Sequence, residues 1–160
     1  MRHGVSLSTS DYHDLLADES IEAVVVASAT DTHGEVVRAA AAAGKHVFLE
    51  KPIAPTLEEA LALVRLANQA GVRHGVIQDK VHLPGLRKLR MLRDAGFFGR
   101  ILAVKIEFGW WVFDGMFQPS QRTSWNYRRT DGGGMALDMC AHFRYILDRA
   151  IAPVTRIVCR

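Results

Sequence analysis

The chain has 160 residues, of which 49% are hydrophobic and 23% charged, as expected for a globular protein that buries a core. The net charge of +3 is small and the basic residues are scattered, which gives little support for nucleic-acid or membrane binding. No apolar run reaches the roughly 18–20 residues of a membrane span and no signal peptide opens the chain, so we expect a cytoplasmic protein.

The first predicted elements are a short strand-like piece at 5–8 and a short helix at 12–16, which Ser10 or Asp11 can cap. The segment 21–27 follows, and its core is a continuous run of β-branched residues instead of an alternating one. Such a run is typical of a strand that is buried on both faces in a parallel sheet.

A helix and a second strand are predicted next. Thr32 and Glu35 have the spacing of a capping box, with Thr32 as the N-cap of an alanine-rich helix that Gly44 ends. The strand at 47–49 comes soon after, so the interval from 24 to 49 is a strand, a helix and a strand. Such crossovers are almost always right-handed and join parallel strands.

The pattern then repeats once more. Thr56 and Glu59 form a second capping box, the helix behind it has apolar residues at helical spacing, and Gly71 is placed to end it. The segment 72–77 offers a further strand. The first half of the chain is therefore predicted to be α/β, as part of a doubly wound sheet with short connections.

The character of the sequence changes near Gln78. From there the pattern predicts an amphipathic helix, a strand, a long aromatic loop, a second helix and the start of a last strand. In chain order these segments are 86–94, 101–108, 110–126, 135–148 and 154–158. The glycines at 132–134 permit positive φ or close backbone approach just before the second helix.

Glu50, Lys51 and Pro52 form a charged turn at the end of the strand at 47–49. In open α/β sheets, ligands bind outside the carboxyl ends of the strands, so Lys51 would leave the sheet at its chemically useful edge. A desolvated ammonium there could polarise a hydroxyl or help to relay its proton. The simpler interpretation is a turn with an ordinary surface ion pair.

Three further side chains are candidates for chemistry. Asp138 and His142 are four residues apart on a predicted helix. Either the Asp138 carboxylate orients the His142 ring so that it can act as a general base, or the two form an ordinary pair on the helix surface. His33 lies in the first turn of its helix, where it either faces a cofactor edge or is simply solvated. Cys140 and Cys159 lack metal-ligand spacing, so no metal site is predicted.

Several of these motifs together resemble the Gfo/Idh/MocA family of NAD(P)-dependent sugar and polyol dehydrogenases. They are the segments 24–33 and 43–47, the turn at 50–52, and the segment 132–138 with His142 and Asp148 behind it. The resemblance covers essentially the whole chain. It implies a hydride transfer between a nicotinamide cofactor, NAD or NADP, and a secondary alcohol of a sugar, inositol or related polyol.

The resemblance also implies a role for each matching residue. Lys51 matches the catalytic lysine that contacts the hydroxyl being oxidised, Asp138 matches the substrate-binding acid, and His142 matches the histidine that takes the proton. The positions that match the nicotinamide-ribose side of the cofactor site are Ser28, Thr30, His33, Glu50, Lys51 and Pro52. The protein's own task is then positioning and proton transfer.

Two family features are absent from these 160 residues: the G-x-G-x-x-G fingerprint, and the acidic residue expected about 20 residues beyond it. The resemblance thus predicts the C-terminal part of a Rossmann domain at 1–78, without its first βαβ unit, and the start of an α+β substrate domain at 79–160. We expect a homo-oligomer in the full-length form. The alternative is a non-catalytic truncated homologue that acts through protein association, because an unpaired apolar strand edge invites another chain.

Overall fold

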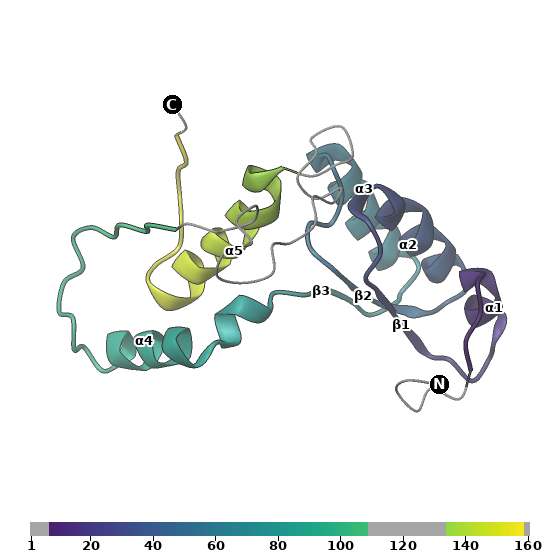
Figure 1. Cartoon of the computed structure of the whole chain (residues 1–160), viewed down its shortest axis with the longest axis horizontal. Helices are drawn as coiled ribbons and strands as arrows, with labels where there is room; N and C mark the ends of the chain where they lie inside the picture. The colour runs from purple at the N-terminus through teal and green to yellow at the C-terminus, as the bar shows by residue number, and fades with distance from the viewer. Residues whose placement is uncertain (1–6, 109–133, 159–160) are drawn as a thin grey trace, which may run out of the picture. The chain divides into compact units, whose positions relative to one another are not determined.

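The structure, a computed structural model, describes residues 7–108 and 134–158 (Figure 1). The chain divides into two compact units, residues 1–77 and 78–160. No helix in the described part of the chain is long and apolar enough to cross a membrane.

The first unit is built on a parallel sheet, as predicted. Its strands run in the order β1-β2-β3 and pair in register, with Val26 of β1 opposite Leu49 of β2. The ladder continues past the ends of β1 and β2, because the Glu50 N–H donates to the Val26 carbonyl at 2.8 Å. The three strands are β1 (Ala23–Val26), β2 (His46–Leu49) and β3 (His74–Val76).

Two helices connect these strands and cover one face of the sheet. They are α2 (His33–Ala42) and α3 (Leu57–Gln69), and they pack against each other (Figure 1). Both crossovers step in the same direction along the sheet, so right-handed connections bring both helices to the same face. The core lies between these helices and the strands and is formed by Leu16, Val26, Val37, Ala40, Val47, Leu49, Ala54 and Leu63.

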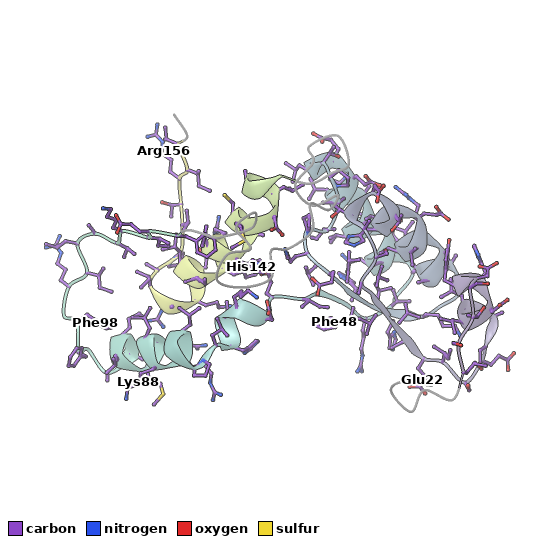
Figure 2. All side chains as sticks on the ribbon, viewed as in Figure 1. Glu22, Phe48, Lys88, Phe98, His142 and Arg156 are labelled. Atoms are coloured by element: carbon purple, nitrogen blue, oxygen red, sulfur yellow. The ribbon has the colours of Figure 1, made fainter. Side chains whose placement is uncertain are left out.

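The other face of the sheet is open in the described part of the unit. Val25 is 67% exposed and Phe48 is 49% exposed, and the two are paired in register with Gly75 beside Phe48 (Figure 2). The prediction that the strand at 21–27 is buried on both faces is therefore wrong for this chain. The continuous apolar run suits two-sided burial, but both connecting helices lie on one side.

The helix ends test the predicted caps. Asp11 caps α1 (Tyr12–Ala17) by accepting from the His13 N–H at 2.9 Å. Thr56 caps α3 in the same way, because its hydroxyl oxygen accepts from the Glu59 N–H at 3.2 Å. These two caps are confirmed.

The cap predicted at Thr32 is wrong. A short 3-10 turn, η1 (Thr30–Thr32), precedes α2 and puts Thr32 itself in a helical backbone conformation. Its hydroxyl therefore bonds backwards, donating to the Ser28 hydroxyl at 2.7 Å and lying 2.8 Å from the Ala29 carbonyl. Glu35, the expected second member of the box, instead accepts a hydrogen bond from the Tyr12 hydroxyl at 2.8 Å.

The second unit is mainly helical where it is described. The elements η2 (Asp79–His82), α4 (Pro84–Asp94) and α5 (Met135–Ala150) pack against one another. The Arg93 guanidinium of α4 donates from Nη1 to the carbonyls of Arg149 and Ile151, at 3.0 and 3.4 Å. Arg93 thus fastens α4 to the C-terminal end of α5.

The strands expected at 101–108 and 154–158 are not formed. A strand needs a neighbour that exchanges main-chain hydrogen bonds, and no described segment supplies one to either stretch. Of the strand-like piece expected at 5–8, residues 7 and 8 are not in a strand and the others lie outside the described residues. The predicted aromatic loop at 110–126 also lies outside them.

Candidate active site

The carboxyl end of β1 carries two of the predicted cofactor-side residues. Ser28 is exposed, and its hydroxyl oxygen accepts the hydrogen bond from Thr32. Thr30 is 0% exposed, and its hydroxyl has no hydrogen-bond partner among the described residues. A buried hydroxyl without a partner is uncommon and marks this strand end as a polar site whose bonding is incomplete.

His33, the first residue of α2, joins this strand end to the next. Its ring is 1% exposed, with Nδ1 at 2.9 Å from the Pro52 carbonyl oxygen and Nε2 at 3.2 Å from the Ser28 carbonyl oxygen. The sequence places His33 in the first turn of a helix but gives no signal for these two long-range contacts. Its contact with a cofactor stays a prediction.

The charged turn follows β2 directly. Glu50, Lys51 and Pro52 are each partly buried, and the Lys51–Pro52 peptide bond is cis. The Lys51 N–H donates to Oε2 of Glu50 at 3.1 Å, so the carboxylate holds the main chain at the point where the lysine leaves the sheet. The structure therefore brings the turn, His33 and Ser28 together at neighbouring strand ends.

Asp138 and His142 lie on α5, as predicted; Figure 2 labels His142. Gly134 precedes this helix with φ of 113°, a conformation that favours glycine, and its carbonyl accepts from the Asp138 N–H at 2.9 Å. Asp138 is partly buried and His142 is 5% exposed. Lys51 belongs to the other unit, so its meeting with this pair stays a prediction.

Asp79 is a further charged residue near His142 that the sequence reasoning missed. The Lys80 ammonium, which Asp79 binds at 3.0 Å, lowers the pKa of the Asp79 carboxyl; burial opposes this, and the nearby His142 makes a smaller contribution that lowers the pKa. Asp79 belongs to η2, which packs against α5. Its position in the sequence, just after the predicted strand at 72–77, was the available signal, because residues that follow strands of α/β sheets often belong to ligand sites. No group of three or more metal-binding side chains occurs in the described ranges.

Comparison with known proteins decides the family. The family profile described as "Oxidoreductase family, NAD-binding Rossmann fold" matches residues 2–78, and the "GFO/IDH/MocA C-terminal domain" matches residues 86–160. The chain belongs to the Gfo/Idh/MocA oxidoreductase family. The parallel sheet with its helices on one face is thus part of a Rossmann-like nucleotide-binding fold, as the sequence predicted.

The Gfo/Idh/MocA relatives include named sugar and polyol enzymes. D-xylose dehydrogenase from Paenarthrobacter nicotinovorans is 48% identical over 98% of this chain and 40% of its own length. Myo-inositol 2-dehydrogenase from Thermotoga maritima is 41% identical over 94% of this chain and 43% of its own length. A solved levoglucosan dehydrogenase, in complex with NADH and levoglucosan, is 27% identical with a TM-score of 0.75, over 94% of this chain and 40% of that one.

The chain therefore spans less than half the length of these relatives. Within that part, the groups at the ends of β1 and β2 suit the nicotinamide-ribose side of a dinucleotide. Ser28, Glu50 and Lys51 offer a hydroxyl, a carboxylate and an ammonium at the surface, and Thr30 adds a buried hydroxyl without a partner in the described residues. The pyrophosphate is different, because these 160 residues lack the G-x-G-x-x-G fingerprint that cradles it.

Proposed function

We propose that this chain carries the nicotinamide-facing and proton-handling part of an NAD(P)-dependent oxidoreductase. The reaction is a hydride transfer at a secondary alcohol of a sugar, inositol or related polyol. The observation that carries the proposal is Lys51 at the carboxyl end of the central strand β2, within a turn braced by Glu50 and His33. The named sugar and polyol dehydrogenases among the relatives support the substrate class.

Lys51 would act on the oxygen of the substrate. When bound, the nicotinamide supplies the hydride acceptor. The Lys51 ammonium donates a hydrogen bond to the reacting hydroxyl and stabilises the negative charge that develops on its oxygen as the C–H bond breaks. Such a charge interaction accelerates the chemical step only to the extent that it is stronger in the transition state than in the ground state.

His142 would take the hydroxyl proton on a ring nitrogen. The reaction then balances, because the carbon loses a hydride, the oxygen loses a proton and a carbonyl group remains. Asp138, one helical turn earlier on α5, would hold a substrate hydroxyl, and Asp79 would stabilise the positive charge that His142 gains. Ser28, Thr30, His33, Glu50 and Pro52 are proposed as the cofactor side of the site.

The test is a titration of the purified chain with NADH and NADPH, followed by nicotinamide fluorescence, and then turnover of D-xylose, myo-inositol and levoglucosan. We expect Lys51→Met to lower kcat by about 100-fold or more, because it removes a charge aimed at the reacting oxygen. Lys88→Met, at an exposed lysine of α4, is the matched control and should leave kcat unchanged. Equal rates for both variants would refute the role of Lys51, and a folded chain without binding or turnover would refute the activity.

A second candidate function is association without catalysis. The exposed side chains of Val25 and Phe48 on the open sheet face favour it, since apolar faces of this kind are normally covered. Sedimentation of the chain at several concentrations tests this candidate. A stable oligomer that binds no cofactor would support it, and a monomer would contradict it. The homo-oligomer expected for the full-length form stays a prediction.

A further inference from the structure

His33 is the most deeply buried ionisable side chain of the first unit's described part. It is 1% exposed, although it lies at the N-terminal end of α2, where a histidine would ordinarily meet solvent. Both ring nitrogens point to main-chain oxygens, Nδ1 to Pro52 at 2.9 Å and Nε2 to Ser28 at 3.2 Å. Neither contact is made within the helix, so the ring contributes to the loops instead.

The two carbonyls belong to the two strand ends of the candidate site. Ser28 lies just beyond β1, and Pro52 lies just beyond β2 and directly after Lys51. The last main-chain hydrogen bond of the ladder between β1 and β2 in the described residues runs from the Glu50 N–H to the Val26 carbonyl. Past that bond, the imidazole contacts a main-chain oxygen of each segment and so links the two.

The contacts of the His33 ring with Pro52 and with Ser28 can be removed one at a time by substitution. Both partners are acceptors, so each contact forms a hydrogen bond only when its nitrogen carries a proton. Asparagine places an amide N–H where Nδ1 lies, facing Pro52, and glutamine places one where Nε2 lies, facing Ser28. Each variant can thus keep one link and lose the other.

We propose that His33 is a positioning residue that sets the placement of Lys51 through the Pro52 carbonyl. This inference rests on the proposed function for its catalytic consequence, but its structural part stands on the two ring contacts alone. Lys51 is held on its N-terminal side by the bond from its own N–H to Glu50. His33 holds the other side, at the next residue. The turn that presents the ammonium is therefore clamped at both ends.

The first experiment follows amide hydrogen exchange by mass spectrometry in His33→Asn, His33→Gln and His33→Ala. We expect exchange in peptides covering 50–54 to rise about tenfold in the Gln and Ala variants and to stay near wild type in Asn. Peptides covering 60–67 of α3 report global stability, and His74→Asn, at an exposed histidine of β3, is the matched control. Equal exchange at 50–54 in all variants would overturn the proposal, as would an equal rise in both regions.

The second readout is kinetic and separates the two proposals. If the wild-type chain turns over a polyol, the Gln and Ala variants should lose about 100-fold in kcat at unchanged polyol KM, and Asn should recover most of that loss. A misplaced reacting group lowers the rate of the chemical step more than it weakens binding. A wild-type chain without turnover would refute the proposed function, while the exchange data would still decide the role of His33.

Discussion

Replacing Lys45 with methionine removes a buried ammonium and keeps its hydrocarbon stem. Lys45 is 8% exposed, and its Nζ donates to the main-chain carbonyl of Asp18, the residue that ends α1, at 2.8 Å. A hydrogen bond to a charged group contributes about 1.5–3 kcal/mol to stability. Two effects reduce the loss: the carbonyl keeps a second donor in the Ile21 N–H at 3.2 Å, and methionine needs no desolvation of a charge. We therefore expect Lys45→Met to lower the free energy of unfolding by about 1 kcal/mol.

The assay is urea unfolding followed by circular dichroism, with a thermal melt as a second measure. A loss of about 1 kcal/mol corresponds to a fall in Tm of about 2–4 °C for a chain of this size. Lys88→Met removes the same charge from an exposed site on α4 and should change the free energy of unfolding by less than about 0.5 kcal/mol. If Lys45→Met unfolds at the same urea concentration as this control, the Lys45 bond contributes nothing and the reasoning is wrong.

Two further predictions concern a cap and a titration. Thr56→Ala removes the acceptor for the Glu59 N–H at the start of α3 and should cost about 1 kcal/mol in urea unfolding, with Thr56→Ser as the variant that restores it. The Val154 N–H and then the Arg144 guanidinium lower the pKa of Asp148, so its contribution is present above the unfolded pKa near 3.9 and disappears as pH falls through the lower folded value. Unfolding midpoints of wild type and Asp148→Asn should therefore differ at pH 7 and converge in strong acid; a constant gap would contradict this.

The sequence predicted the first unit well where the signals were local. Thr56 has a cap partner three residues ahead, and Gly44 and Gly71 end their helices with φ of 70° and 69°. Hydrophobic runs flanked by such signals locate strands without any knowledge of the rest of the fold. The charged turn after β2 was found in the same way, because it breaks an apolar run.

The failures all depended on partners that a local pattern does not contain. Thr32 had the spacing of a cap, but it is the last residue of a 3-10 turn, and in that backbone conformation its hydroxyl bonds to Ser28. The stretch 101–108 alternates like a strand, yet strand formation needs a neighbour, and none is present among the described residues. His33 begins α2, as predicted, but its contact with Pro52 was not predicted, because it joins residues that are far apart in the chain. No periodicity carries that information.

The two bonds from Arg93 to the end of α5 determine how the second unit can move. Both acceptors lie in or just beyond the final turn, whereas Asp138 and His142 lie in the first half of the same helix. A helix is stiff along its axis, so α5 cannot slide along α4 without breaking both bonds at once. A rearrangement that shifts Asp138 and His142 and keeps both bonds must therefore either pivot about Arg93 or carry α4 along with α5.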